Sequence, residues 1–586
     1  MVAAASRSRA TAAEAARLLL LGWRAGRLRG ILDLLLAAPG TPHFGFGYAK
    51  WVAQHGVASL EARRLLRERS RAFTQQPLIS VLMPVYKPDL DLLREAVDSV
   101  FEQTYQHWQL CIADDASDDP SCRDYLKTLM SRDSRIKVVF RDKNGHISAA
   151  SNSALDLCAG EFTALLDQDD LLPAHALHCV VDCINRNPGA RLIYSDEDKI
   201  DVKGVHYDPY FKPDWDSYLI LGQNLFSHLG VFETKLMREV GGFRQGYEGS
   251  QDYDLLLRCL AKAGSGSVFH IPHVLYHWRA VPGSTAQAMG QKSYAADAAL
   301  RALADYLTNT KRPGRIEPGA FPGMYRFRPT PPSDTITVSV LFDAPPSDLA
   351  AWQRALSGLD ANLAVECLFP DPDRAVNSVA PRPESATRAA RLNQLAKIAK
   401  GDVLLFASAG VEPAGPASVS ELVALASISS VGVAGARIIE ASRRVLHAGY
   451  VLGMFGGLDS PHRGFPVATP GYFGQLELLR RASAVSAAAM AVRRNVFQQL
   501  GGFSDLAIGI LELDFSRRVE SAGMDTVITP HADFVATQPT LVALTDSSIS
   551  VPGTDWPEDR HYNPNLTLMH GAYLIDRAPR VALPWA

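Results

Sequence analysis

Cysteines and long apolar runs are both scarce in this sequence, and each absence narrows the class of protein. The seven cysteines are scattered over 586 residues and form no C-x-x-C pair, so we expect reduced thiols, as in a cytosolic protein. Near the N-terminus, the apolar run 18–23 is stopped by Arg24, and the run 31–38 contains Asp33. Neither run is long enough to span a bilayer, and the nearby arginines argue against a signal peptide. We therefore expect the protein to stay in the cytoplasm.

An overall excess of positive charge is also missing. The 59 basic and 62 acidic side chains give a net charge of −3, which argues against a nucleic-acid partner. Residues 1–76 nevertheless hold twelve Lys or Arg and four Asp or Glu, a net charge of +8 that leaves about −11 on the other 510 residues. Arginines between leucines in this region favour contact with an anionic membrane, such as the cytoplasmic face of the inner membrane. The alternative is a helical extension that packs on the next domain.

The length predicts more than one domain, because 586 residues exceed what a single hydrophobic core normally holds. The hydrophobic fraction of 47% and the charged fraction of 21% exclude a largely disordered chain.

Strand-like and helix-like segments alternate after residue 76. Runs rich in β-formers cover residues 78–86, 108–113, 136–140 and 162–166, and helical periodicity separates them, as in residues 92–101. This alternation predicts an α/β fold with a mostly parallel sheet covered by helices on both faces. Ligands on such sheets bind outside the carboxyl ends of the strands, and two of these ends are acidic here.

The second half of the chain resembles a degraded copy of the first. Gly241-Gly242-Phe243 is matched by Gly501-Gly502-Phe503. At the same spacing after these glycines, Asp252, Asp254 and Arg258 are matched by Glu512, Asp514 and Arg518. We infer a duplication. The predicted organisation is a basic helical region at 1–76, a catalytic domain at 77–312, a Pro-rich linker at 313–334 and a degenerate domain at 335–586.

Three acidic clusters follow strands or open helices in the first copy. Residues 114–119 contain four aspartates and a serine, a composition that suits either helix capping or ligand binding, and both readings stay open. Residues 167–170 place three carboxylates in four positions, and a hard divalent cation bridging to phosphate would relieve their repulsion. Residues 250–254 open a helix, where acidic side chains also complement the helix dipole.

Taken together, these segments resemble the inverting glycosyltransferase family 2 enzymes, which have the GT-A fold. The resemblance covers residues 77–285. It is carried by six segments in order, at 81–86, 114–118, 144–145 with Asn152, 167–170, 241–243 and 251–254. Residues 195–198 and 276–279 are similar to the subgroup that builds bacterial O-antigens and other surface polysaccharides. The resemblance implies that both copies have the GT-A fold.

The resemblance also implies a donor site for a nucleotide-sugar. Pro84 and Tyr86 would line the nucleotide pocket, with Asn144 among the donor-binding residues. Asp114 or Asp115 would accept a hydrogen bond from the base. Asp167 would lie near the ribose.

The implied chemistry needs a divalent cation, Mg²⁺ or Mn²⁺, and a general base. Asp169 would ligate the cation, and His277 would be a further metal or diphosphate ligand, or else an ordinary surface or core histidine. Asp252 would take the proton of the acceptor hydroxyl. Asp196, Trp215, Tyr247 and Gln251 would lie near the sugars.

Two positions depart from the family pattern. Gln251 stands where the family often has Glu, but the aspartate that follows it is present. Ala154 stands where the family usually has glycine, two residues after Asn152.

The expected partners are a nucleotide-sugar and a glycan acceptor, which we expect to be lipid-linked. The second copy has no carboxylate pair opposite residues 167–170, so we expect it to be catalytically silent and to extend the acceptor groove. One alternative is a sugar-nucleotide pyrophosphorylase, but residues 84–88 lack the Gly-rich basic signature of such enzymes. The other alternative is a non-catalytic glycan-binding or assembly protein, which would need neither Asp169 nor Asp252.

Overall fold

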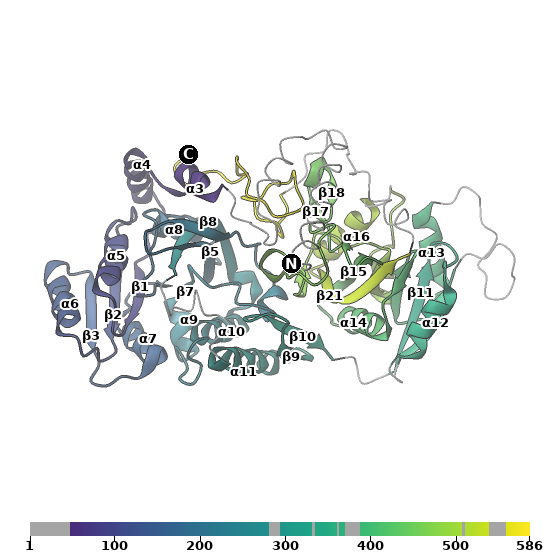
Figure 1. Ribbon diagram of the computed structural model, residues 1–586, viewed down its shortest axis with the longest axis horizontal. Helices are drawn as coiled ribbons and strands as arrows, with labels where there is room; N and C mark the ends of the chain where they lie inside the picture. The colour runs from purple at the N-terminus through teal and green to yellow at the C-terminus, as the bar shows by residue number, and fades with distance from the viewer. Residues whose placement is uncertain are drawn as a thin grey trace, which may run out of the picture.

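The computed structural model describes residues 47–280, 293–330, 335–359, 363–369, 387–506, 510–537 and 558–586. They form two lobes side by side, each built on its own large β-sheet (Figure 1). Within these ranges, helices long and apolar enough to cross a bilayer are absent. The arginines on which the predicted membrane contact depends come before residue 47 and lie outside the described residues.

The first lobe contains an eight-stranded mixed sheet in the order β3-β2-β1-β4-β7-β5-β6, with β8 paired to β5. The first four strands are mutually parallel, and β8 is parallel to β5. β6 and β7 run antiparallel to their neighbours. This arrangement confirms the predicted α/β class. The strands are β1 (Ile79–Val85), β2 (Trp108–Asp114), β3 (Ile136–Phe140), β4 (Phe162–Leu165), β5 (Leu192–Ile200), β6 (His206–Tyr210), β7 (Val231–Glu233) and β8 (Val268–Arg279).

Both faces of this sheet are buried, which explains its nearly continuous apolar strands. Along β1, Leu82 faces one core, whereas Val81 and Met83 face the other. Two of the helices that cover the faces begin at a capping aspartate: Asp89 accepts the backbone N–H groups of residues 91 and 92, and Asp119 accepts that of Ser121. These helices are α5 (Leu90–Phe101), α6 (Pro120–Arg132), α7 (His146–Leu157), α8 (Ala176–Arg186), α9 (Thr234–Glu239), α10 (Gln251–Ala263) and α11 (Ser293–Asn309).

The described part of the predicted N-terminal region is largely helical and packs on the first lobe. It contains α3 (Tyr48–Trp51), a π-helical turn (Val52–Gly56) and α4 (Leu60–Arg71). At the end of α4, the Ser70 hydroxyl lies 2.8 Å from Nδ1 of His178 on α8. This part of the chain therefore matches the alternative of a helical extension packed on the next domain.

The stretch predicted as a Pro-rich linker contains an ordered hairpin instead of an extended connection. Strands β9 (Gly314–Pro318) and β10 (Tyr325–Pro329) pair antiparallel. The hairpin is fixed to the first lobe, because the backbone N–H of Tyr325 donates to the carbonyl of Gly222 over 2.7 Å.

The second lobe repeats the central order of the first sheet, because β12-β11-β13-β20-β15-β21 corresponds to β2-β1-β4-β7-β5-β8. Its strands run β12-β11-β13-β20-β15-β21-β14, with β16 and β19 at the side. They are β11 (Ile336–Phe342), β12 (Leu363–Leu368), β13 (Val403–Ala407), β14 (Val411–Pro413), β15 (Val431–Glu440), β16 (Val445–His447), β19 (Arg480–Arg481), β20 (Ala489–Arg493) and β21 (Asp525–Ala536). The flanking helices are α12 (Leu349–Ser357), α13 (Arg388–Ile398), α14 (Pro416–Ala426), α15 (Arg494–Gln499) and α16 (Ile510–Ser521).

Hydrogen bonds at matching positions support the inferred duplication. In the first lobe, the Asn152 side chain accepts from the N–H of Phe243 (2.8 Å) and donates to its carbonyl (2.7 Å). In the second lobe, Asn393 makes the same two bonds with Phe503, at 2.9 and 2.7 Å. A network this specific at equivalent positions is difficult to explain without common descent of the two halves.

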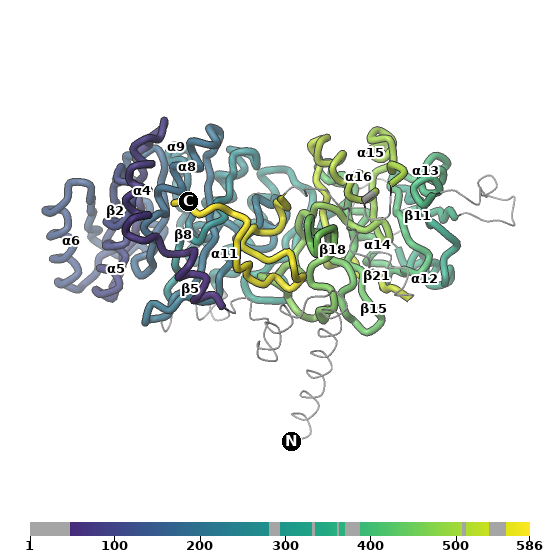
Figure 2. Tube along the Cα trace, turned by 90° about the horizontal axis from the view of Figure 1, so that it is seen from above, coloured from purple at the N-terminus to yellow at the C-terminus, as the bar shows by residue number. Residues whose placement is uncertain are grey.

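A C-terminal strap, residues 558–586, ties the two lobes together. It leaves the second lobe and runs across the first to α3 and α4 (Figure 2). At its end, Arg69 of α4 donates to the backbone carbonyl of Ala586 over 2.8 Å, and the Trp585 ring contacts His175 edge-on at 5.1 Å.

Candidate functional site

A cleft of about 820 Å³ lies at the carboxyl ends of β1 and β4. Such positions are where ligands bind in open α/β sheets. Eight of the thirteen predicted site residues line this cleft: Pro84, Tyr86, Asp115, Asn144, Asp167, Asp169, Gln251 and Asp252.

One part of the cleft is formed by the loops after β1, β2 and β3. The carboxylate of Asp115 accepts from Nε of Arg141 (2.6 Å) and from the N–H of Gly145 (3.0 Å), so it holds the loop that carries Asn144. The backbone N–H of Tyr86 donates to Gln168 over 2.8 Å, which joins this part to the acidic segment after β4.

Asp114 does not line the cleft. Its side chain is buried, and its Oδ1 accepts the backbone N–H of Ser117 over 3.2 Å. Asp114 thus shapes the turn and Asp119 caps α6, whereas Asp115 faces the cleft.

The acidic segment after β4 places carboxylates at two depths. Asp167 and Asp169 line the cleft, while Asp170 is buried behind them and accepts from the Tyr276 hydroxyl (2.6 Å) and the N–H of Arg279 (2.7 Å). Burial, and then the neighbouring charge of Asp169, raises the pKa of Asp167 to about 6. Burial raises the pKa of Asp169 as well. The cleft therefore concentrates negative charge that a cation would stabilise.

Asp252 stands in the first turn of α10 and faces the cleft. Its Oδ2 accepts from the Asn224 side chain over 2.8 Å, which fixes the orientation of the carboxylate. Gln251 uses its side-chain oxygen to accept the N–H of Gly249 over 2.8 Å, so it stabilises the turn before the helix.

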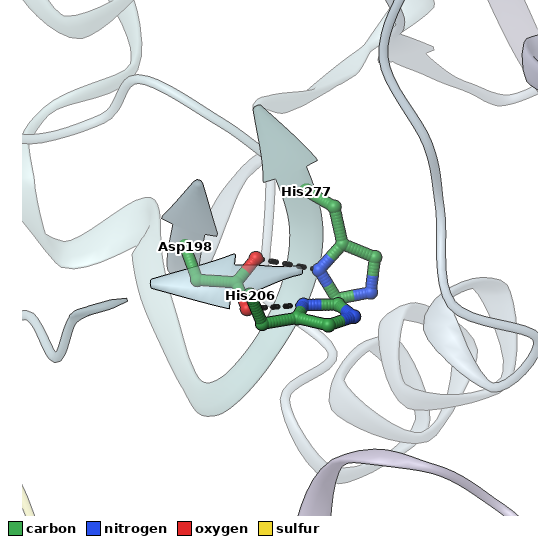
Figure 3. A group of neighbouring side chains, drawn as sticks. All are labelled: Asp198, His206 and His277. Atoms are coloured by element: carbon green, nitrogen blue, oxygen red, sulfur yellow. Dashed lines mark hydrogen bonds and ion pairs between the residues drawn. The ribbon is translucent and has the colours of Figure 1, made fainter. Parts of the chain in front are cut away.

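His277 does not line the cleft but belongs to a histidine–aspartate group beside it. Asp198, on β5, is buried and bonds Nδ1 of His277 (2.6 Å) and Nδ1 of His206 (2.7 Å), as Figure 3 shows. Burial opposes the charge on Asp198, but His277 and His206 lower its pKa overall. A carboxylate that holds both Nδ1 atoms leaves Nε2 of each ring to contact a ligand.

Among the described residues, two groups bring their ligand atoms close enough to hold a metal ion: Asp198 with His206 and His277, and Asp167 with Asp170 and His228. Asp169 belongs to neither. Asp169 is connected to His277 through the chain. Leu171, two residues after Asp169, forms two backbone hydrogen bonds with His277, of 3.2 and 2.9 Å.

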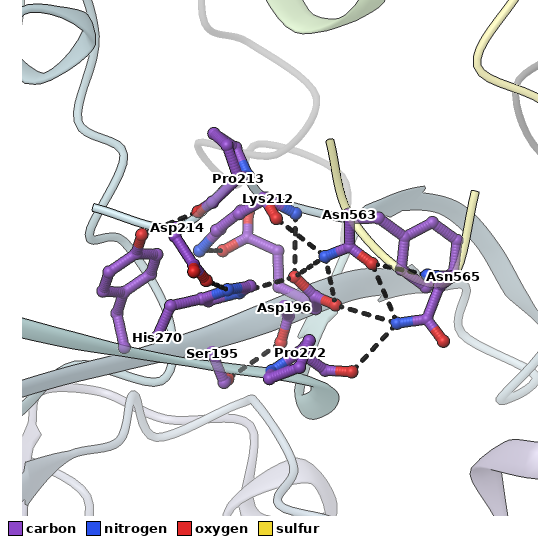
Figure 4. A network of polar contacts seen from close by, with 12 residues as sticks. Ser195, Asp196, Lys212, Pro213, Asp214, His270, Pro272, Asn563 and Asn565 are labelled. Carbon is purple, nitrogen blue, oxygen red and sulfur yellow. Dashed lines mark hydrogen bonds and ion pairs between the residues drawn. The ribbon is translucent and has the colours of Figure 1, made fainter. Parts of the chain in front are cut away.

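Three residues predicted near the sugars lie elsewhere. Asp196 is fully buried on β5, where Asn563 and Asn565 of the C-terminal strap bond its carboxylate (Figure 4). Trp215 packs against the core of the lobe. The hydroxyl of Tyr247 donates to Asp305 over 2.8 Å, and its ring is covered by Arg244.

Sequence reasoning missed a buried ion-pair group at the cleft. Nζ of Lys212 donates to Glu197 over 2.9 Å, and Nδ1 of His228 lies 3.3 Å from the same carboxylate oxygen. Burial opposes each charge, but Lys212 and His228 lower the pKa of Glu197 to about 2. Glu197 in turn outweighs burial in raising the pKa of His228 to about 9. His228 thus places positive charge beside Asp167 and Asp170. A single histidine outside any motif did not indicate a site residue in the sequence.

In the second lobe, an arginine occupies the region that corresponds to the cleft of the first lobe. Arg388 pairs with Asp343 (2.8 Å) and with Glu512 (3.2 Å), the counterpart of Asp252, and also donates to Ser408 (3.0 Å). These internal contacts occupy the space between β11, β13 and α16.

Comparison with known proteins fits this geometry. Residues 80–239 match the model of the family "Glycosyl transferase family 2". Over these residues the chain contains a glycosyltransferase family 2 domain.

Two curated relatives match most of the chain. An uncharacterized protein of Sinorhizobium fredii, y4gI, is 37% identical over 88% of this chain and 60% of its own length. The O-antigen biosynthesis protein RfbC of Myxococcus xanthus is 30% identical over 92% of this chain and 44% of its own length. The chain therefore spans about half the length of these relatives. The chain is also similar to the crystal structure of S. aureus TarS residues 1–349 in complex with UDP. The two are 18% identical over 39% of this chain and 70% of the TarS chain, with a TM-score of 0.30.

Proposed function

We propose that this protein is a metal-dependent inverting glycosyltransferase. It transfers a sugar from a nucleotide-sugar to a hydroxyl of a cell-surface glycan, which we take to be lipid-linked. The observation that carries the proposal is the single cleft that brings together Asp115 and Asn144, the carboxylates of Asp167 and Asp169, and Asp252. The similarity to an O-antigen biosynthesis protein supports the class of acceptor.

The residues of the cleft fit a divalent cation. Asp167 and Asp169 are oxygen ligands of the kind that Mg²⁺ and Mn²⁺ prefer. Burial raises the pKa of both carboxylates, and the charge of Asp169 adds to the effect at Asp167, so a bound cation would stabilise their charged form. We assign Asp169 as the ligand and Asp167 to the ribose side, with Nε2 of His277 as a further contact to the metal or the diphosphate. When bound, the cation would offset the charge of the departing nucleoside diphosphate.

Asp252 is suited to the role of general base. Its carboxylate lies in the cleft and is oriented by Asn224, so it can accept the proton of the acceptor hydroxyl as that oxygen attacks the anomeric carbon. A single displacement from the face opposite the nucleotide inverts this carbon, and no covalent enzyme nucleophile is required.

The second lobe is assigned a non-catalytic role in this proposal. Arg388 pairs with Glu512, so the counterpart of the base is engaged in an internal ion pair. Within the basic region 1–76, the arginines before residue 47 are assigned to peripheral contact with anionic lipid at the cytoplasmic face of the inner membrane, with the catalytic domain held near its acceptor.

Metal-dependent donor binding is the first test. UDP, GDP and dTDP are screened by thermal shift with Mn²⁺ or Mg²⁺; a ligand at a hundred times its Kd stabilises the folded state by about 2.7 kcal/mol. We expect one nucleotide to give this shift, EDTA to abolish it and Asp169→Ala to reduce it strongly. Asp98→Ala, which removes an exposed carboxylate of α5, is the matched control. An equal shift in EDTA and in Asp169→Ala would contradict the metal-bridged donor.

Turnover is the second part of the same test. Asp252→Asn should keep the nucleotide shift but lower the rate of nucleotide-sugar cleavage by about 10²–10⁴-fold. NMR of the sugar first released from an α-linked donor should show the β-anomer. Retained turnover in Asp252→Asn would place the base elsewhere. Glycan binding without any cleavage would favour the non-catalytic alternative, and pyrophosphate-dependent nucleotide-sugar formation would favour the pyrophosphorylase.

A further inference from the structure

The catalytic cleft is not built by the first lobe alone. Phe473, from a 3-10 turn of the second lobe (Tyr472–Gly474), lines the same cleft as Asp252. Its ring stacks on that of Tyr210 at the end of β6, with centroids 3.9 Å apart and planes inclined by 10°. A non-catalytic lobe thus places an aromatic side chain in the active cleft.

A short chain of contacts connects this aromatic pair to the proposed base. Asn224 donates to Asp252, and its neighbour Gln223 donates to the Tyr210 hydroxyl over 2.7 Å. Tyr210 then stacks on Phe473. Gln223, Asn224, Tyr210 and Phe473 all line the cleft. Tyr210 ends β6, at the opposite edge of the sheet from β2 and β3, whose following loops carry Asp115 and Asn144.

The conformation of Phe473 indicates that its position is imposed by its surroundings. Its φ of 42° lies in the left-handed region, which bulky side chains rarely adopt. The preceding residue, Tyr472, anchors the turn, because its hydroxyl accepts the N–H of Phe211 in the first lobe over 2.9 Å. Its ring also stacks on Tyr573 of the C-terminal strap, with centroids 4.6 Å apart. Three parts of the chain therefore hold Phe473 at the cleft.

We propose that Phe473, backed by the buried ring of Tyr210, forms a sugar-binding platform for the acceptor glycan, next to the residue whose hydroxyl is deprotonated by Asp252. The apolar C–H face of a pyranose packs well on an aromatic ring, and an adjacent amide such as Gln223 supplies hydrogen bonds to its hydroxyl groups. This inference rests on the proposed function and assigns the second lobe a role in acceptor selection.

The test separates acceptor binding from donor binding in the full-length protein. The probe is an array of bacterial O-antigen repeat-unit oligosaccharides, applied with Mn²⁺ and the nucleoside diphosphate selected above. We expect Phe473→Ala to lose about tenfold or more in glycan affinity, because a ring contact and its buried area disappear. Phe473→Trp, which keeps an aromatic face, should retain binding. Calorimetry should give the same nucleotide affinity in both variants.

Phe455→Ala is a matched control, because Phe455 is also a partly buried phenylalanine with positive φ in a 3-10 turn of the second lobe, but does not line the cleft. It should leave glycan and nucleotide affinities unchanged. Unchanged glycan affinity in Phe473→Ala, an equal loss in Phe455→Ala, or a wild-type protein that retains none of the oligosaccharides would overturn the platform. A failure of the proposed function itself would be visible separately, as absence of metal-dependent nucleotide binding in the wild type.

Discussion

At the residue scale, Asp115 serves both the fold and the cleft. Its side chain is almost completely buried, and it joins Arg141 to the loop at Gly145 by charge-assisted hydrogen bonds. The same carboxylate faces the cleft. A substitution here would therefore disturb the structure as well as the proposed nucleotide site, and stability must be measured before any loss of binding is interpreted.

Asp115→Ala should lower the free energy of unfolding by about 2–3 kcal/mol, because it leaves Arg141 largely buried without its carboxylate partner. Asp118→Ala, in the same acidic turn, removes an exposed pair with Lys87 and should cause no measurable change. Urea denaturation followed by tryptophan fluorescence compares the two variants. Equal effects of the two substitutions would contradict the structural role of Asp115.

The residues of the cleft differ in how far they could be predicted. The acidic clusters carry a local signal, since several carboxylates follow one strand, and Asp115, Asp167, Asp169 and Asp252 do line one cleft. The division of labour between Asp114 and Asp115 was not predictable, because it depends on which carboxylate points into the turn. Phe473 gave no signal either, because its partner Tyr210 lies in the other lobe.

At the element scale, the C-terminal strap stabilises β5 from outside the lobe. Asn563 donates to both carboxylate oxygens of Asp196, each at 3.0 Å, and to the carbonyl of Lys212 at 2.7 Å. His270 and the N–H of Lys212 complete the shell around Asp196, at 2.9 and 2.7 Å. Asp196 precedes Glu197 and Asp198 in the strand, so the strap supports the segment that carries the ion-pair group and the histidine group.

Asn563→Ala should loosen the strap. It removes three hydrogen bonds and leaves the buried Asp196 carboxylate less satisfied, at a cost of about 2 kcal/mol. Hydrogen–deuterium exchange of residues 562–576 should accelerate tenfold or more. Asn495→Ala, at an exposed asparagine of α15, should leave this exchange unchanged. Unaltered exchange in Asn563→Ala would show that the strap is held by its other contacts.

The regular elements could be predicted well where hydrophobic patterning is local. The predicted strand 136–140 has the observed bounds of β3, and the predicted run 162–166 extends one residue past β4. The hairpin β9–β10 was missed, because its prolines suggested a linker. Pro318 and Pro329 stand at the ends of the two strands, where a proline removes few ladder hydrogen bonds. The strap has no periodic pattern and could not be recognised from sequence.

At the scale of the whole molecule, the two lobes act as one unit because their seam contains specific polar contacts. The N–H of Arg481 in the second lobe donates to Asp216 in the first over 2.7 Å, and Tyr218 bonds Ser430 across the seam at 3.0 Å. The duplication was visible in the spacing of glycines and carboxylates, but the register of one copy against the other is set by these long-range contacts. The place of Phe473 in the cleft, and with it the proposed platform, depends on that register.

Several buried histidines in the second lobe predict an acid-sensitive molecule. Nε2 of His447 accepts the N–H groups of Gly449 (3.3 Å) and Ser486 (3.2 Å), and Nε2 of His462 accepts that of Tyr472 (3.0 Å), so both rings must be neutral at Nε2. Burial lowers the pKa of His447 to about 3, whereas an unfolded histidine has a pKa of about 6.5. Between these values the unfolded chain binds more protons than the native state.

The free energy of unfolding should therefore rise with pH up to about 6.5 and fall below it, by roughly 1.4 kcal/mol per pH unit for each such histidine. Calorimetry should show a lower Tm at pH 5.5 than at pH 6.5. His447→Gln keeps a hydrogen-bond acceptor near the position of Nε2 but does not titrate in this range, so its Tm should decline less than that of the wild type between pH 6.5 and 5.5. His107→Gln, at an exposed position of the first lobe, should follow the wild type. If His447→Gln loses as much Tm on acidification as the wild type, His447 does not contribute to the acid sensitivity, and the burial argument fails for this residue.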